Sequence, residues 1–113
     1  MNNITTDRCG FSERDEQTIR GILIKYPVVK TVYLFGSRAK GNHNPGSDVD
    51  LAIMNEGADV KTIGRIKSDF EESSLPYRVD IINYPAMTHI KLKDHIDRIG
   101  VPFYEIQDPD RDG

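Results

Sequence analysis

The feature that most constrains the fold is the break between two apolar segments in FGSRAKGNHNPGSDVDL, residues 35–51. Residues 28–35 are rich in β-branched and aromatic side chains, which predicts a strand, and residues 50–54 predict a second one. The first strand stops at Gly36, and the second follows Asp48 and Asp50. One end of a sheet should therefore carry a glycine turn and two carboxylates, joined by a polar loop that lets both face the same ligand.

The rest of the chain supplies the elements that would complete this sheet. A helix should open at Ser12, through a capping interaction with Asp15, and end before Pro27. Further helices are predicted at residues 60–73 and 86–99, and further strands at 77–84 and 101–106, the last at a sheet edge because it contains Pro102. The expected fold class is α/β (α+β), a small mixed β-sheet flanked by helices.

Length and composition suggest a single domain, residues 1–113, with flexible tails at 1–11 and 107–113. The net charge of −3 argues against a general duplex-binding protein, which needs a basic face. Cys9 is the only cysteine, so neither an internal disulfide nor a zinc site is expected. No apolar run approaches the length that crosses a membrane, and the default prediction is a cytoplasmic location.

Gly36 and Ser37 form the first candidate binding element. A glycine directly after a strand allows a sharp turn and a close approach of ligand to backbone. Ser37 could cap a short helical turn, whose free N–H groups and hydroxyl would attract an anion. Arg38 and Lys40 add positive charge nearby. A Gly-Ser pair by itself is more often only a turn, so this element needs support from others.

Asp48 and Asp50 form the second element. Residues i and i+2 of a strand point to the same face, so their carboxylates repel each other unless a cation lies between them. Oxygen ligands of this kind suit Mg²⁺. The alternative is a solvated aspartate pair where the strand begins, after Pro45 and Gly46.

Asp80 is the third element, within the apolar segment RVDII. A carboxylate inside a strand is costly unless it is paired, hydrogen-bonded or bound to a metal. An ion pair with Arg78 on the same face is the competing explanation. If this strand lies beside the one that carries Asp50, three carboxylates converge, and metals held there could serve in-line displacement at phosphorus.

Gly36-Ser37, then Asp48-Val49-Asp50, then an aspartate on a later strand resemble the signature of the DNA polymerase β-like nucleotidyltransferases. The GSRAKG…SDVDLAI form, the SSLPYRVDIINY segment and the small size resemble the minimal nucleotidyltransferase group. The resemblance covers residues 28–84. Lys40 stands where many members of the group have arginine.

The resemblance implies a role for each matching residue. Gly36 and Ser37 would hold the triphosphate, with further nucleotide-binding candidates at Arg38, Lys40 and Ser47, although Ser47 could simply shape the turn. Asp48 and Asp50 would bind two Mg²⁺ ions, and Asp80 would complete the metal site and help to activate the attacking hydroxyl. The implied reaction transfers a nucleoside monophosphate, expected to be AMP from ATP, with release of pyrophosphate.

The resemblance also implies a partner, because the chain is too short for the helical domain of larger relatives. Relatives of this size are commonly paired with a HEPN-domain toxin, a helical protein in which the antitoxin modifies a tyrosine; a homodimer is another assembly. Two alternatives stay open. One is an enzyme that modifies a small molecule such as an aminoglycoside, and the other is a non-catalytic nucleotide-binding subunit that neutralises its partner by contact.

Other polar side chains have simpler explanations. His43 in the loop could touch phosphate, but a solvated histidine is the expected reading. His89 and His95 are six residues apart on a helix and should not form a metal pair. Tyr84 could stack on a base, although ordinary packing is expected.

Overall fold

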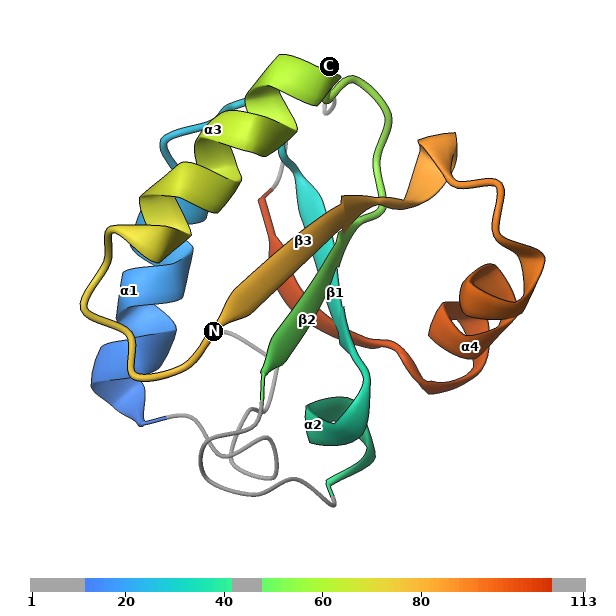
Figure 1. Cartoon of the computed structure of the whole chain (residues 1–113), viewed down its shortest axis with the longest axis horizontal. Coiled ribbons are helices and arrows are strands. Elements are labelled where there is room, and N and C mark those ends of the chain that lie inside the picture. The colour runs from blue at the N-terminus through green and yellow to red at the C-terminus, as the bar shows by residue number, and fades with distance from the viewer. Residues whose placement is uncertain (1–11, 42–47, 107–113) are drawn as a thin grey trace.

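The computed structural model describes residues 12–41 and 48–106, and it confirms the predicted α/β architecture (Figure 1). The elements, in chain order, are α1 Glu13–Leu23, β1 Thr31–Phe35, α2 Ser37–Lys40, β2 Val49–Ile53, α3 Val60–Glu71, β3 Val79–Asn83, the 3₁₀ turn η2 Tyr84–Ala86, α4 Ile90–Ile99 and β4 Val101–Glu105. Cys9, His43, Ser47 and the predicted tails lie outside the described residues.

The strands form one four-stranded sheet in the order β3-β2-β1-β4. Strand β1 is antiparallel to β2 and β4, whereas β2 and β3 are parallel, so the sheet is mixed as predicted. Strands β3 and β4 are the edges, which agrees with the position of Pro102. The register places Phe35 opposite Asp50, and Asp50 opposite Asp80.

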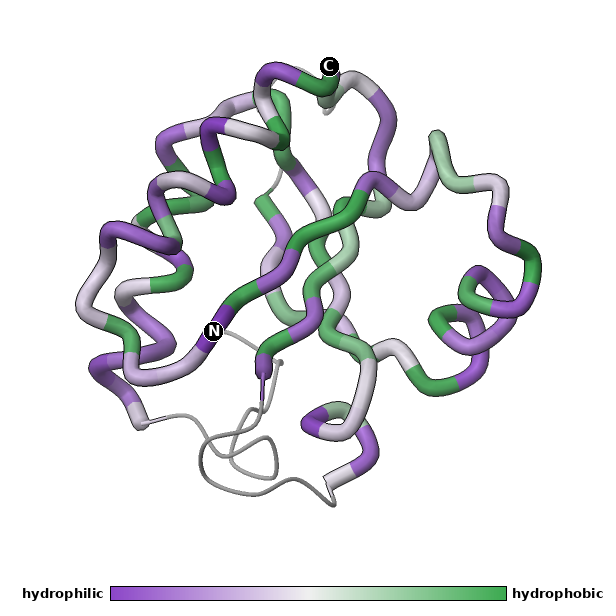
Figure 2. Tube along the Cα trace, viewed as in Figure 1, coloured by the Kyte–Doolittle hydropathy of each residue, from purple (hydrophilic) through white to green (hydrophobic). Residues whose placement is uncertain are grey.

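Helices pack on both faces of this sheet. Helices α1 and α3 lie on one face, with α4 on the other (Figure 1). The larger core cluster, which includes Leu51 and Ile81, lies between the sheet and α1 and α3. A smaller cluster of Phe35, Ala52 and Ile96 lies under α4. Side chains alternate along a strand, so Asp50 and Asp80 share the face of Ala52. Figure 2 shows hydrophilic positions near the starts of β2 and β3, within otherwise hydrophobic strands.

Side chains cap the helices at their first turns. Ser12 caps α1 by accepting a hydrogen bond from the N–H of Asp15, as predicted. Asp59 caps α3 by accepting from the N–H of Thr62.

Three predicted helix boundaries were wrong, and the smallest error is at α3, which ends at Glu71 rather than at residue 73. Helix α1 ends at Leu23 rather than just before Pro27, because the N–H groups of Lys25 and Tyr26 bond to carbonyls three residues back in a tightened last turn. The helix predicted from residue 86 begins at Ile90, because His89 accepts the N–H of Leu92 and caps it there.

The first strand begins at Thr31 rather than at residue 28. The side-chain oxygen of Asn55 accepts the N–H groups of Lys30 and Thr31, and its amide donates to the carbonyl of Val28. Asn55 thus takes the N–H groups of Lys30 and Thr31 that would otherwise be available for strand pairing. The strands predicted from residues 50 and 77 begin at Val49 and Val79.

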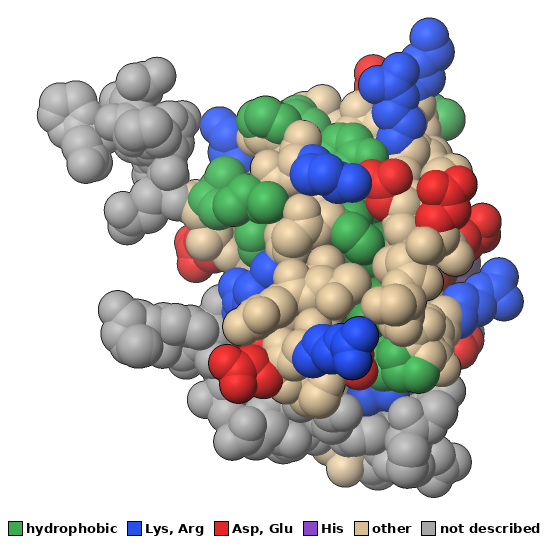
Figure 3. Space-filling model, turned by 90° about the vertical axis from the view of Figure 1, so that its left-hand side faces the viewer, with side chains coloured by type: hydrophobic (Ala, Val, Ile, Leu, Met, Phe, Trp, Pro, Cys, Tyr) green, Lys and Arg blue, Asp and Glu red, His purple; other side chains and the backbone are tan. Residues whose placement is uncertain are grey.

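Figure 3 shows the side of the molecule on which α1 and α3 lie. On this side, positive and negative side chains of the described residues are interspersed. That face shows no continuous basic patch of the kind that duplex binding requires. None of the helices in the described part of the chain has the length and hydropathy of a membrane span.

Candidate active site

The site begins at the turn that follows β1. Gly36 has φ 84° and ψ −159°, a backbone conformation essentially restricted to glycine. It is also the N-cap of α2, which corrects the prediction that Ser37 caps this helix; Ser37 is instead its first residue and is exposed. A Cβ atom on Gly36 would overlap Oδ2 of Asp50. The backbone of the turn therefore lies directly against the Asp50 carboxylate.

Asp50 and Asp80 lie side by side on the parallel strands β2 and β3. This confirms that the strand of Asp80 lies beside the strand of Asp50, which the predicted convergence of the carboxylates requires. Asp50 is partly buried, and burial raises the pKa of its carboxyl group. The negative charges of Asp80 and Asp48 raise the pKa of Asp50 further, whereas His95 lowers it. The electrostatic interaction expected among the three aspartates is therefore present around Asp50.

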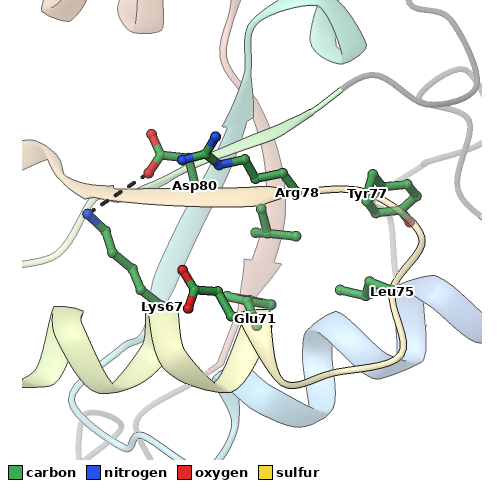
Figure 4. Close-up of a pocket in the computed structure, with 8 residues that line it drawn as sticks. Lys67, Glu71, Leu75, Tyr77, Arg78 and Asp80 are labelled. Atoms are coloured by element: carbon green, nitrogen blue, oxygen red, sulfur yellow. Dashed lines mark ion pairs between the residues drawn. The ribbon is translucent and has the colours of Figure 1, made fainter.

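The side chain of Asp80 is 54% exposed, so the burial cost expected of a carboxylate within a strand does not arise. The reason is that β3 is an edge strand. Among the described residues its ion pair is with Lys67 of α3, at 4.0 Å, rather than with Arg78 (Figure 4). The sequence could not indicate this partner, because only the packing of α3 on β3 brings it close.

The donor set fits a magnesium ion in its chemistry. Within the described residues no group of three or more His, Cys, Asp or Glu side chains is arranged to hold a metal ion. Asp50 and Asp80 nevertheless offer two neighbouring carboxylates that repel each other, and Mg²⁺ usually takes only one or two protein carboxylates. Asp48 is exposed just before β2.

Arg38 has a different environment from the one expected of a phosphate ligand. It is completely buried, and its guanidinium lies 4.5 Å from the ring centre of Tyr77. The hydroxyl of Tyr77 donates to Asp15 of α1, at 3.0 Å. This placement favours a structural role for Arg38 over direct contact with phosphate. Lys40 is exposed at the end of α2.

Helix α4 adds a residue that sequence reasoning missed. His95 packs edge-on against Phe35, with ring centres 6.2 Å apart, and its charge acts on Asp50. The only signal in the sequence was its position next to Ile96, which is buried against the same face of the sheet. Tyr84 packs against this cluster and donates to Asp97, at 2.5 Å, in agreement with the packing role expected of it.

A glycine turn beside a carboxylate pair, on a small mixed sheet, is the arrangement expected of a nucleotidyltransferase. A comparison of families supports that class, since the model for "Polymerase beta, Nucleotidyltransferase" matches residues 17–109. The chain belongs to this family.

Two curated relatives resemble the chain over 76 residues. The probable protein adenylyltransferase MntA of Haemophilus influenzae is 41% identical, over 66% of each chain. The putative protein adenylyltransferase MJ0435 of Methanocaldococcus jannaschii is 36% identical, over 66% of this chain and 78% of its own.

Solved structures share the fold. A toxin-antitoxin crystal structure with AMP-PNP matches with a TM-score of 0.66 and 23% identity, over 86% of this chain and 78% of the other. A crystal structure of the toxin-antitoxin MntA-HepT matches with a TM-score of 0.61 and 20% identity, over 88% and 78%.

Proposed function

We propose that this protein is a magnesium-dependent nucleotidyltransferase that moves AMP from ATP to a tyrosine hydroxyl of a HEPN-domain toxin, and that it acts as the antitoxin of that pair. The observation that carries the proposal is the row formed by Gly36, Asp50 and Asp80 across three adjacent strands or their ends. Family membership supports the reaction class, and the curated relatives named as protein adenylyltransferases support a protein acceptor.

The proposed reaction forms one P–O bond, breaks another and transfers one proton. The tyrosine oxygen attacks the α-phosphorus of ATP as its proton passes to the carboxylate of Asp80. The bond between the α-phosphorus and the oxygen that bridges to the β-phosphate breaks, and pyrophosphate leaves with those electrons. The product is an O-adenylyl tyrosine. Positioning of the two reactants supplies much of the rate enhancement in such transfers.

Each part of the site has an assigned task. The backbone at Gly36 and Ser37 holds the triphosphate, and Lys40, with Ser47 as a further candidate, supplies polar contacts. Asp48, Asp50 and Asp80 would hold two Mg²⁺ ions. When bound, magnesium neutralises charge on the phosphates and lowers the energy of the transition state. Because the donor is ATP, we place the reaction in the cytoplasm.

The partner is proposed from the nature of the relatives. Structures described as toxin-antitoxin complexes share this fold, one of them with an ATP analogue, and that combination favours a toxin as acceptor. The described residues contain only the sheet and its covering helices, so contacts between the partner and these elements are expected to position the acceptor tyrosine.

The test is to incubate the protein with labelled ATP, Mg²⁺ and the protein encoded by the neighbouring gene, and to look for label on that second protein. We expect label on a tyrosine of that protein, located by mass spectrometry, and release of pyrophosphate in equal amount. Asp50→Asn should reduce the rate at least about 100-fold, since metal and substrate positioning both depend on the carboxylate.

Glu56→Gln is the matched control, because it also removes one negative charge from an exposed residue beyond the end of β2. It should label the partner at the wild-type rate. Absence of label with wild-type protein, while the toxin is still neutralised, would replace this proposal with neutralisation by contact alone.

A further inference from the structure

His95 lies on the face of the sheet that carries the candidate active site. Phe35 is opposite Asp50 in the antiparallel pair of β1 and β2, and the side chains of directly opposite residues point to the same face. The ring of His95 packs edge-on against Phe35, with ring centres 6.2 Å apart. Phe35 also packs with Ile96, the residue next to His95. His95 and the Asp50 carboxylate are therefore on the same side of the sheet, the side away from α1 and α3 (Figure 1).

The contact with Phe35 also fixes where His95 lies along the sheet. Phe35 is the last residue of β1, and Gly36 follows it directly. A Cβ atom at Gly36 would overlap Oδ2 of Asp50, so the turn and this carboxylate adjoin. His95 thus lies at the end of the sheet where the proposed phosphate-binding turn meets Asp50. It is on the β1 side of Asp50, whereas Asp80 is on the other side, on the edge strand β3.

The imidazole of His95 is available to a ligand. His95 is only partly buried, and its ring nitrogens form no hydrogen bond or ion pair with the residues that the structure describes. The charge of His95 lowers the pKa of the Asp50 carboxyl group, so the two side chains are within electrostatic range of each other. Because they interact without forming an ion pair, a phosphate group can lie between them.

The chemistry of imidazole favours phosphate over the metal as its ligand here. Mg²⁺ prefers oxygen ligands, so a histidine beside the ion is not expected to join its coordination shell. An imidazole carries at least one N–H donor whether it is neutral or protonated, and phosphate oxygens are strong acceptors. A contact with phosphate therefore does not depend on the protonation state of His95.

We propose that the imidazole of His95 donates a hydrogen bond to the β- or γ-phosphate of the bound nucleoside triphosphate. The inference rests on the proposed adenylyl transfer, and it adds a residue of α4 to the triphosphate site. In-line displacement places the attacking and leaving oxygens on opposite sides of phosphorus. With the attacking hydroxyl at Asp80, the leaving phosphates belong on the other side of Asp50, where His95 lies. The hydrogen bond stabilises the charge that develops on the leaving pyrophosphate, and no proton is transferred to it.

The first test is His95→Phe, because a phenyl ring can keep the packing against Phe35 but has no N–H. The ligand is α,β-methylene ATP with Mg²⁺, whose α–β bridge cannot be cleaved. Its dissociation constant should rise about 10-fold or more, as expected when a hydrogen bond to a charged group is lost. The dissociation constant of AMP, measured by NMR titration, should stay as in wild type, because AMP lacks the β- and γ-phosphates.

Two further variants complete this test. His95→Gln should restore most of the affinity, because its side-chain amide also offers an N–H donor. Ile90→Phe is the matched control, because it places the same ring on α4 at a residue that is 79% exposed and leaves His95 unchanged. It should bind α,β-methylene ATP as wild type does. Urea unfolding of each variant checks that the fold is retained.

The second test observes the wild-type ring directly. Addition of α,β-methylene ATP or pyrophosphate, each with Mg²⁺, should shift the imidazole nitrogen NMR signals of His95, whereas AMP should not. His89 is the internal reference, because its ring nitrogen accepts the N–H of Leu92 and caps α4. The signals of His89 should stay in place.

The outcomes separate this inference from the proposed function. If His95→Phe binds α,β-methylene ATP as tightly as wild type, or if the His95 signals do not move, His95 only packs against Phe35, although labelling of the partner would still support adenylyl transfer. An equal loss of affinity for AMP would also overturn the assignment to the β- and γ-phosphates. If wild-type protein labels no partner, adenylyl transfer is wrong, and the binding measurements alone decide the role of His95. If wild-type protein binds neither α,β-methylene ATP nor pyrophosphate, both proposals fail.

Discussion

A methyl group at position 36 would meet Oδ2 of Asp50, and the backbone there has a conformation that other residues adopt only under strain. Gly36→Ala should therefore lower the free energy of unfolding by about 1–3 kcal/mol, the usual cost of such strain. It should also weaken nucleotide binding, because relief of the overlap must move either the turn or the carboxylate. Urea denaturation and titration with an ATP analogue measure the two effects.

Gly64→Ala is the control for this change. Gly64 lies inside α3, and an added Cβ would meet nothing within 4 Å. Alanine in a helix interior is favoured over glycine by roughly 0.5–1 kcal/mol, so this variant should be more stable than wild type. Equal stability changes in the two variants would contradict the special role of position 36.

The raised pKa of Asp50 predicts a dependence of stability on pH. The folded protein holds the Asp50 proton more tightly than the unfolded chain, whose value is near 3.8. As pH rises above that value, deprotonation is easier in the unfolded chain, so this residue makes unfolding more favourable. Without metal, Asp50→Asn should be more stable than wild type at pH 7, and the difference should shrink as pH falls toward 3.8.

Urea unfolding in EDTA across this pH range provides the measurement. Added Mg²⁺ and ATP should remove or reverse the advantage of the asparagine variant, since wild type alone can then use the carboxylate. A wild-type protein that is the more stable of the two at pH 7 in EDTA would contradict the burial and repulsion assigned to Asp50.

At the scale of elements, the sequence predicts which helices and strands form, and in what order, better than it predicts the residues at which they begin and end. Ser12 and its first-turn partner locate the start of α1 correctly, because a cap is a local interaction. The start of β1 was missed because it depends on Asn55, a residue distant in sequence whose side chain bonds to the backbone at residues 28–31. Boundaries set by such long-range hydrogen bonds carry no local signal.

The buried guanidinium of Arg38, in helix α2, lies over the ring of Tyr77. Tyr77→Phe removes the hydrogen bond to Asp15 and should cost about 1.5 kcal/mol, as expected for a bond to a charged acceptor. Tyr77→Leu also removes the ring next to the buried guanidinium and should cost about 1 kcal/mol more. Tyr84→Phe, which removes a more exposed bond to Asp97, should lower the free energy of unfolding less than Tyr77→Phe does.

Chemical denaturation of the three variants tests this ranking. A double-mutant cycle of Tyr77→Phe with Asp15→Ala should show strong non-additivity, because the two residues share one hydrogen bond. Additive effects would show that Tyr77 does not anchor α1 through Asp15.

At the scale of the molecule, the sequence could indicate Asp48, Asp50 and Asp80 as a set but not their order across the sheet. Only the parallel pairing of β2 and β3 brings Asp50 beside Asp80, and pairing between distant strands is a property of the whole fold. The positions of Lys67 and His95 also depend on the whole fold, because these residues approach the aspartates from helices on opposite faces of the sheet. The contact of the buried Arg38 with Tyr77 likewise joins residues that lie far apart in the sequence.

The convergence of carboxylates on one end of the sheet predicts that ligand binding stabilises the whole molecule. A ligand that binds only the folded state, at 100 times its dissociation constant, adds about 2.7 kcal/mol. For a domain of this size that corresponds to a rise in Tm of about 10 °C. Mg²⁺ with ATP should produce such a shift in calorimetry, whereas the double variant Asp48→Asn, Asp50→Asn should shift little. Mg²⁺ alone should have a smaller effect, because the phosphates supply part of its coordination shell. A shift of equal size in the double variant would show that these two carboxylates do not bind the metal.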